Sequence, residues 1–211
     1  MISPIRVLLA DDHPTLRVGL RVLLDHESDI TVIAEAADGQ TALEQAAELR
    51  PDVAVLDCQL PTLDGVAVAA EIRRHALPTR VIALSAYDDS RYLAGMAESG
   101  ALGYLLKNEA PGQIAAAVRS AAGGQPLWTS SQQGRIARWQ SEVSQVRESL
   151  TEREQEVLQH IAAGLSNKEI AATLHITVRT CDFHVSNILR KLNAISRVEA
   201  AMWATEHLDR Q

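Results

Sequence analysis

Side chains that suit phosphoryl chemistry follow four short apolar segments in the first half of the chain. Asp11 and Asp12 end the segment IRVLLADD, and Asp57 ends DVAVLD. Ser85 follows RVIAL, and Lys107 ends GYLLK. If these segments are parallel strands, their carboxyl ends lie along one edge of a sheet, where open α/β sheets bind ligands. The five side chains would then gather in one place.

Three carboxylates at one edge repel one another unless a cation lies between them, and hard oxygen ligands suit Mg²⁺ or Mn²⁺. A lysine and a small hydroxyl beside that cation would contact the oxygens of an incoming phosphoryl group. The residues therefore predict phosphoryl transfer to a carboxylate, which forms an acyl phosphate. The alternative is that acids at strand ends simply cap helices or face water. This alternative is adequate for any single aspartate, but it does not explain five suitable residues on four strand ends.

A second set of candidate residues lies in TVRTCDFHVSNILRKL, residues 177–192. At about 100° per residue, one helix face is apolar and packs inward, through Cys181, Val185, Ile188 and Leu192. The opposite face is polar except for one aromatic ring, and it carries Arg179, Phe183, Ser186, Asn187 and Arg190. Lys191 and Asp182 lie on the flanks of this face. For an isolated helix, ordinary solvent exposure of this face is the simpler interpretation.

After a tight helical turn, the same face suits DNA. Arg179, Arg190 and the preceding Lys168 would hold phosphates, while Ser186 and Asn187 would reach base edges in the major groove. Lys191, on the flank of this face, is also expected to contact DNA. Asp182 would accept a hydrogen bond from cytosine N4 or orient Arg179. Phe183 would contact a thymine methyl or be covered by the first domain in an inactive form.

The elements that position the first set of residues alternate between strand-like and helix-like segments. Five short aliphatic runs are typical of strands buried on both faces, and amphipathic helical patterns separate them. Five strands alternating with five helices predict a doubly wound parallel sheet over residues 1–123. The strands are expected at residues 5–10, 30–36, 52–57, 80–85 and 103–107, and the helices at 14–26, 40–50, 66–75, 90–100 and 111–122.

The elements that position the second set are all helical. Residues 124–148 are polar and predict a linker, with some helix around residues 133–147. From residue 149 to 211 we expect a separate helix-turn-helix domain. Thr151 with Glu154, and Ser166 with Glu169, fit capping boxes, Thr177 suits the N-cap of the third helix, and Asn193 suits the left-handed residue after it.

Composition excludes several other classes of protein. No apolar run is long enough to span a bilayer, the N-terminus lacks the basic start of a signal peptide, and Cys58 and Cys181 form no close-spaced metal or redox motif. A cytoplasmic protein is expected. The net charge of −7 arises in residues 1–123, which carry 17 acidic and 10 basic residues, while residues 149–211 carry 8 and 7. A nucleic-acid role therefore depends on where charges lie.

The motifs LLADDHP, AVLDCQLPTLDG, ALSA and GYLLK resemble those of a response-regulator receiver domain. The resemblance implies that Asp57 is the phosphoacceptor and that Asp11 and Asp12 bind the metal with it. It further implies that Ser85 is the switch hydroxyl, Lys107 the phosphate-binding lysine and Tyr104 an aromatic rotamer switch.

Five positions beside these motifs have no role that the motifs alone assign. Gln59 and Tyr87, each two residues beyond a key residue, resemble positions that control acyl-phosphate lifetime, or are simply exposed loop residues. His13 and Cys58 adjoin the site and need no chemical role. Asn108 replaces the proline that follows the lysine in many receivers, so the geometry of the Lys107–Asn108 bond stays open.

Residues 149–204 closely resemble a LuxR-type helix-turn-helix domain through LTEREQEVL and GLSNKEIA. The whole chain therefore resembles a NarL/FixJ-type response regulator. This resemblance implies phosphorylation by a partner histidine kinase, dimerisation, binding to double-stranded DNA and regulation of transcription. It also implies no enzymatic activity beyond the chain's own Mg²⁺-dependent phosphorylation and dephosphorylation.

Two other functions compete with this one. The first is an atypical, phosphorylation-independent regulator whose recognition helix mainly contacts protein, a hypothesis motivated by the near-neutral C-terminal part, by Asp182, where the family often has lysine, and by Phe183. The second is an aspartyl-phosphate phosphatase. Such enzymes usually carry another aspartate two residues after the nucleophile, where this chain has Gln59, and no substrate-cap insertion is visible.

Overall fold

The computed structural model describes residues 3–208 and divides the chain into two compact units, Met1–Trp139 and Gln140–Gln211. The predicted domain termini at residues 1–2 and 209–211 lie outside the described residues. In the first unit, five parallel strands form one sheet in the order β2-β1-β3-β4-β5. The strands are β1 (Ile5–Ala10), β2 (Ile30–Ala36), β3 (Val53–Asp57), β4 (Arg80–Ser85) and β5 (Gly103–Leu106). The predicted doubly wound α/β fold is confirmed.

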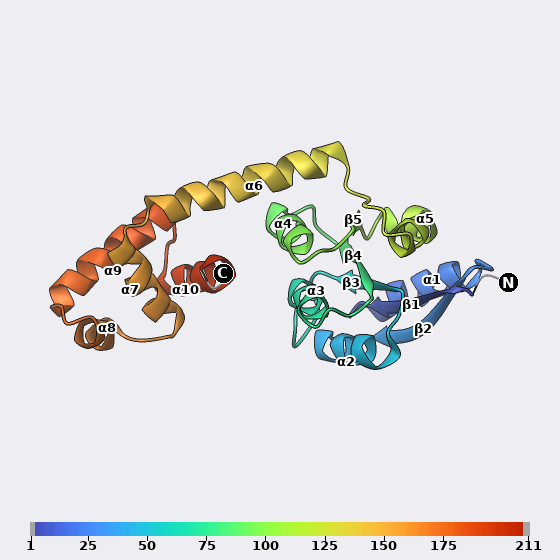
Figure 1. Cartoon of the computed structure of the whole chain (residues 1–211), viewed down its shortest axis with the longest axis horizontal. Helices are drawn as coiled ribbons and strands as arrows, with labels where there is room; N and C mark the ends of the chain where they lie inside the picture. Colours follow the sequence, from blue (N-terminus) through green and yellow to red (C-terminus); the bar gives the residue numbers. More distant parts are fainter. Residues whose placement is uncertain (1–2, 209–211) are drawn as a thin grey trace. The chain divides into compact units, whose positions relative to one another are not determined.

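Helices cover both faces of this sheet (Figure 1). They are α1 (Pro14–Asp25), α2 (Gly39–Leu49), α3 (Gly65–Arg74), α4 (Ser90–Glu98) and α5 (Ala110–Ala122). Because side chains alternate along a strand, β1 sends Val7 and Leu9 into the core beneath α1 and α5, and sends Leu8 and Ala10 into the opposite core with α2, α3 and α4. Burial on both faces explains why the strands are continuous apolar runs.

The region predicted as a polar linker is largely one helix, α6 (Ser130–Ser149), in which none of the side chains is buried. The helix is longer than the expected 133–147, and the division between the two compact units falls inside it. The first part of α6 belongs to the first unit. Ile136 in this part, and Trp128 just before the helix, pack against the core that lies between the sheet and helices α2, α3 and α4.

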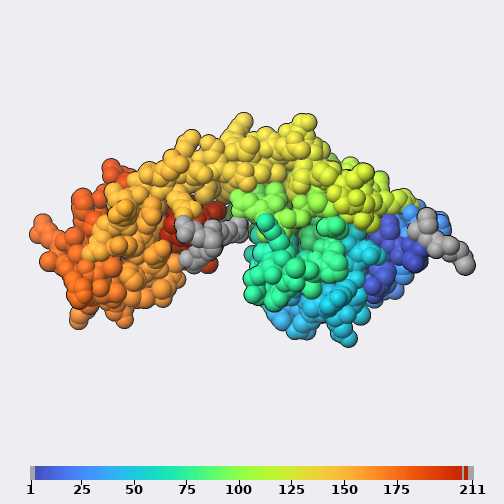
Figure 2. All heavy atoms as spheres, viewed as in Figure 1, coloured from blue at the N-terminus to red at the C-terminus, as the bar shows by residue number. Residues whose placement is uncertain are grey.

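The second unit is helical, as expected, with α7 (Glu152–Ala162), α8 (Asn167–Thr173), α9 (Val178–Leu192) and α10 (Arg197–His207). Both predicted capping boxes are present, at Thr151 and Ser166. Thr177 accepts a hydrogen bond from the Thr180 backbone N–H at the start of α9, and Asn193 is left-handed, with φ 52°, after its end. Leu158, Ile161, Ile170 and Ile188 are buried members of the core of this unit. Figure 2 shows one face of its outer surface, in orange and red.

Among the described residues, no helix is both long and apolar enough to cross a membrane.

Candidate functional site

The sheet topology brings three of the predicted residues into direct contact at one edge. Asp11 follows β1, Asp57 ends β3 and Lys107 follows β5. The Lys107 ammonium lies 2.6 Å from Asp57 Oδ2 and 2.9 Å from Asp11 Oδ2. Both carboxylates are 2% exposed. A partly buried cation and two buried carboxylates therefore form the centre of the site.

The same edge carries the donor set for a divalent cation. Ligand atoms of Asp11, Asp12, His13 and Asp57 lie within 4.8 Å of one another. Asp11 Oδ2 and Asp12 Oδ1 are buried and accept no hydrogen bond from any residue in the described part of the chain. Asp11 Oδ2 faces the charge of Lys107, and Asp12 Oδ1 lies 2.5 Å from the His13 ring. Because unsatisfied buried carboxylate oxygens are costly, a hard cation fits this edge.

Burial is the largest influence on the charges of the site. It raises the pKa of Asp57, against hydrogen bonds from Lys107 and from the Gln59 backbone, and nearby Asp11 raises it further. Burial also lowers the pKa of Lys107, but its interactions with the Asp57 and Asp11 carboxylates outweigh this effect, so its pKa lies above the usual value. The lysine therefore stays protonated and compensates part of the negative charge.

The end of β3 also requires a glycine that the sequence argument did not single out. A side chain at Gly65 would place its Cβ 2.0 Å from the Asp57 carbonyl oxygen. Gly65 begins α3, and its backbone N–H donates to the Cys58 carbonyl oxygen at 3.1 Å. Any larger residue would push α3 away from the strand that carries Asp57.

The hydroxyls of Ser85 and Tyr104 meet at the backbone of Tyr87. Each donates to the Tyr87 carbonyl oxygen at 2.8 Å, and the Tyr87 backbone N–H donates to Ser85 Oγ at 3.1 Å. Tyr104 is buried, and its burial raises the pKa of the phenol. The Tyr87 ring, by contrast, is 64% exposed. The loop after β4 is thus tied to both predicted switch residues.

Gln59 supports Asp57 through its backbone, because its N–H donates to Asp57 Oδ1 at 3.0 Å. Its exposed side chain donates to the Tyr92 hydroxyl of α4 at 3.3 Å. Tyr92 was not predicted, and no sequence motif indicates it. The Lys107–Asn108 bond is trans, like the other peptide bonds of residues 3–208.

The first part of α6 is fastened to the loop after β4. The Arg135 guanidinium forms an ion pair with the Asp88 carboxylate, donates to the Asp88 carbonyl oxygen at 3.0 Å and to Ser90 Oγ at 3.1 Å. One turn earlier, the Gln132 side chain donates to the Tyr104 carbonyl oxygen at 3.1 Å. These contacts were not predicted, because the linker has no regular apolar pattern.

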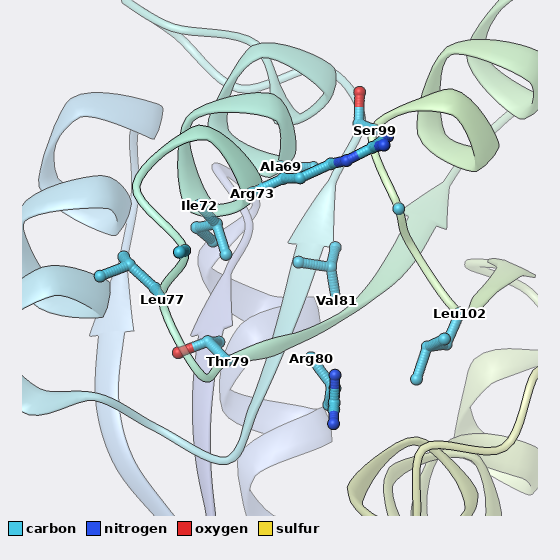
Figure 3. Close-up of a pocket in the computed structure, with 11 residues that line it drawn as sticks. Ala69, Ile72, Arg73, Leu77, Thr79, Arg80, Val81, Ser99 and Leu102 are labelled. Carbon is cyan, nitrogen blue, oxygen red and sulfur yellow. The ribbon is translucent and has the colours of Figure 1, made fainter.

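A surface pocket of about 220 Å³ lies at the opposite edge of the sheet (Figure 3). It is lined by Ile72 and Arg73 of α3, by Thr79 and Arg80 at the start of β4, and by Ser99 after α4. None of its lining residues is a carboxylate. The pocket is therefore separate from the acidic edge.

In the second unit, α9 has the two faces that its spacing predicts. Cys181, Val185 and Ile188 are buried in the core. Arg179, Phe183, Ser186 and Arg190 are exposed on the other face, with Asn187 partly exposed. Phe183 is 65% exposed. We call these five residues the α9 stripe.

Several polar side chains of α9 already have partners within the unit. Ser186 Oγ donates to the Asp182 carbonyl oxygen at 2.9 Å, and Arg190 donates to Asn187 Oδ1 at 3.3 Å. Lys191 Nζ lies 2.6 Å from Glu154 Oε2 and donates to the Ser149 carbonyl oxygen at 2.7 Å.

Asp182 also has a partner, since its Oδ1 accepts a hydrogen bond from the Asn167 amide at 2.7 Å. Lys191 and Asp182 thus face neighbouring helices, which helical periodicity alone did not reveal. Arg179 and Lys168, in contrast, are exposed and have no ion-pair partner within residues 3–208.

Comparison with known proteins assigns both units to families. Residues 7–119 match the response regulator receiver domain, and residues 148–204 match the bacterial regulatory proteins of the luxR family. The transcriptional regulatory protein LiaR of Bacillus subtilis is 40% identical over 203 residues, which are 95% of this chain and 96% of LiaR. The response regulator protein VraR of Staphylococcus aureus is 35% identical over 203 residues, 96% and 97% of the two chains.

A solved structure agrees with these relatives. The response regulator ChrA of a heme-sensing two-component system is 35% identical, with 97% of this chain and 98% of ChrA covered and a TM-score of 0.56. The match spans both units, and the sequence matches place a receiver before a luxR-type domain in one chain. This chain therefore belongs to the two-component response regulators that join a receiver domain to a LuxR-type helix-turn-helix DNA-binding domain.

Proposed function

We propose that this chain is a cytoplasmic transcription regulator in which phosphorylation of Asp57 by a sensor histidine kinase controls dimerisation and sequence-specific DNA binding. The observation that carries the proposal is the buried Asp57, which lies 2.6 Å from Lys107 and within 4.8 Å of ligand atoms of Asp11 and Asp12. We assign residues 1–123 to the receiver, 124–148 to the linker and 149–211 to the DNA-binding domain.

In the proposed reaction, an Asp57 carboxylate oxygen attacks the phosphorus of a phosphohistidine. The P–N bond breaks as the O–P bond forms, and the product is an acyl phosphate. Lys107, which already contacts Asp57 Oδ2 at 2.6 Å, would hold an oxygen of the transferred group. Asp11, Asp12 and Asp57 would hold a Mg²⁺ or Mn²⁺ ion, which would neutralise charge on the phosphoryl oxygens.

The lifetime of the acyl phosphate would depend on the residues that limit the approach of water. Gln59 and Tyr87 are both exposed beside the site. The Gln59 side chain is held by Tyr92 at 3.3 Å, whereas the Tyr87 ring has no such tether among the hydrogen bonds of the described residues. We propose that both modulate hydrolysis without taking part in the transfer.

A short path leads from Asp57 to the linker helix. When Ser85 donates to a phosphoryl oxygen, it can no longer donate to the Tyr87 carbonyl oxygen, which it now does at 2.8 Å. Tyr104 shares that acceptor, and Asp88, the next residue, holds Arg135 of α6. We propose that phosphorylation loosens or shifts this group and so changes how α6 is held.

The α9 stripe supports the DNA-binding part of the proposal. Arg179, Arg190 and Lys168 would bind phosphates, and Ser186 and the free amide nitrogen of Asn187 would reach base edges. Lys191 is occupied by Glu154, so we leave it out of the proposed contacts.

The proposed active form is a homodimer, as the family resemblance implies. Both units carry exposed apolar side chains that a second copy would cover, at Val18 and Val22 of α1 and at Val198 and Met202 of α10. Sedimentation velocity with and without a small-molecule phosphodonor tests this part. A single monomeric species under both conditions would contradict it.

A second candidate is a regulator whose α9 mainly contacts protein and which acts without phosphorylation. The 65% exposed Phe183 ring is the observation in its favour. The two candidates differ in their use of Asp57. Incubation with acetyl phosphate and Mg²⁺, followed by intact-mass measurement, should add one phosphoryl group to the wild-type chain, and chelation of the metal should prevent the addition. A chain that stays unmodified under all donors would contradict the leading proposal.

A further inference from the structure

Asp182 belongs to a chain of hydrogen bonds that joins three helices of the second unit. Arg197, the first residue of α10, donates to Asn167 Oδ1 at 2.7 Å and also to the Leu165 carbonyl oxygen. Asn167, the first residue of α8, donates through Nδ2 to Asp182 Oδ1 of α9 at 2.7 Å. We call Arg197, Asn167 and Asp182 the α9 brace.

The brace determines what Asp182 can do. Both ends of the Asn167 amide are used, which fixes the orientation of the amide group. The Asp182 carboxylate is thereby held toward α8 and is linked, through Asn167, to the positive charge of Arg197. A carboxylate held in this way ties α9 to α8 through its Oδ1 atom.

Phe183, the next residue, lies on the α9 stripe. Arg179 is one turn before it, Ser186 and Asn187 are one turn after it, and Arg190 follows a turn later. The five stripe residues include two cations and no carboxylate, so the stripe suits a polyanion. In the middle of this surface the ring is 65% exposed.

An exposed ring between two cations suits a polyanion that also offers an apolar group. The major groove offers one apolar group on its base edges, the C5 methyl of thymine. The phosphates on either side would engage Arg179 and Arg190, which places the ring against the base edges between them.

We propose that Phe183 is a specificity-determining residue that packs on a thymine methyl, and that the α9 brace is the positioning device that presents it. This inference rests on the proposed DNA-binding function and adds the base feature that is recognised. A protein surface that covers the ring instead is the competing occupant.

The test uses thymine and deoxyuridine, which pair identically but differ by the one methyl group. Duplexes are first selected from a randomised pool with the phosphorylated chain, and each thymine of the selected site is then replaced singly by deoxyuridine. At one position of each half-site, the replacement should weaken binding by wild type about fourfold, the effect of one buried methyl-sized group. The variant Phe183→Ala should bind the two duplexes equally.

Val178→Ala is the matched control, because Val178 is an exposed apolar residue of the same helix, 45% exposed, but lies off the stripe. It should keep the fourfold difference. The inference is overturned if wild type tolerates every thymine replacement, or if Phe183→Ala keeps the wild-type difference. If wild type selects no duplex, the proposed function fails together with the inference.

The brace is tested with a conservative pair of variants. Asp182→Asn keeps an acceptor oxygen for Asn167 and should retain the thymine preference, whereas Asp182→Ala should lose most of it while the salt dependence of non-specific binding stays unchanged. Circular dichroism checks that both variants fold. Equal thymine preference in both would show that the brace does not position Phe183. A changed preference at a cytosine in Asp182→Asn would make Asp182 a base contact and overturn the positioning role.

Discussion

The acidic edge of the first unit and the α9 stripe of the second are assembled in different ways. At the acidic edge, Asp11, Asp57 and Lys107 come from three strand ends, and the parallel sheet forces them together. On α9, the helix alone decides which residues are exposed. Side chains from other helices then occupy some of the polar residues of α9 and leave the others free to bind a partner. Asn167 occupies Asp182 through a hydrogen bond, and Glu154 occupies Lys191 through an ion pair.

The two regions therefore differ in how far residue type and spacing alone determine the role of a side chain. Backbone topology leaves little choice at a sheet edge, so residue type and strand position are sufficient to locate the site. On a helix surface, one hydrogen bond from a neighbour changes the role of a charge. We therefore expect substitutions at the acidic edge to act as all or none, and substitutions around α9 to have graded effects.

The largest effect is expected for Asp57→Ala, which removes the proposed nucleophile. Phosphorylation by acetyl phosphate with Mg²⁺ should be abolished, as measured by intact mass. Glu48→Ala, which removes an exposed carboxylate of α2, should be phosphorylated like wild type. If the Asp57 variant is still modified stoichiometrically, the phosphoryl acceptor is another residue. Substitutions at the acidic edge would then not act as all or none.

A smaller effect, on stability, is expected for Glu154→Ala. This carboxylate accepts from the Thr151 backbone N–H at 2.8 Å and pairs with Lys191 at 2.6 Å, in a buried position. Its loss should destabilise the second unit by about 2 kcal/mol, because a cap is lost and a cation is left unpaired. Hydrogen exchange of amides in α7 and α9 measures the effect. Glu169→Ala, which opens the exposed capping box, should cost less, and equal losses would contradict the account.

The pH dependence of this stability has a defined sign. Burial raises the pKa of Glu154, but hydrogen bonds from Lys191 and Thr151 outweigh it, so the pKa lies below its ordinary value. Its contribution is then fully present above the pKa of the unfolded chain and is lost as the pH falls through the lower pKa of the folded chain. The Glu154→Ala variant should therefore lose less stability than wild type on acidification.

A graded effect on DNA binding is expected for Arg190→Ala. If Arg190 contacts a phosphate, the variant should bind all duplexes several-fold more weakly, and the slope of log affinity against log salt should fall by about one per bound copy. Lys191→Ala is the matched comparison, because its ammonium is engaged with Glu154, and it should leave that slope unchanged. A loss confined to particular sequences would make Arg190 a base contact.

The smallest effect is expected for Asp182→Lys. Replacing a carboxylate by an ammonium beside the α9 stripe should tighten non-specific binding a few-fold and steepen its salt dependence. The substitution also removes the acceptor of Asn167, so selectivity among duplexes should decrease. Titrations with random duplex at several salt concentrations measure both quantities. Unchanged non-specific binding would place Asp182 away from the DNA.

Much of the fold was predictable from local patterns. Side-chain periodicity and local hydrogen-bonding preferences, which act over a few residues, predict the five strands and the alternation of strands with helices. They also predict both capping boxes and the left-handed Asn193. The extent of α6 was not predictable, since its polar surface has no apolar period. Its first part is held by Arg135 and Gln132, whose partners Asp88 and Tyr104 are distant in sequence.

The candidate site, too, was predictable only in part. The approach of Lys107 to Asp57 follows from strand ends, but the shared carbonyl acceptor of Ser85 and Tyr104 depends on the conformation of the loop at Tyr87. Likewise, the exposure of Phe183 follows from helical spacing, whereas the brace at Asp182 requires α8 and α10 to be packed against α9. Contacts between elements are what the one-dimensional pattern lacks.

The central claim is that the state of Asp57 controls duplex binding through the second unit. It is tested most directly by fluorescence anisotropy of a randomised duplex pool at low salt, comparing the phosphorylated wild-type chain with Asp57→Ala treated with the same donor. We expect tighter binding by the phosphorylated chain, with an affinity that falls as salt is added. Identical binding by the two proteins, or no binding by the phosphorylated chain, would contradict it.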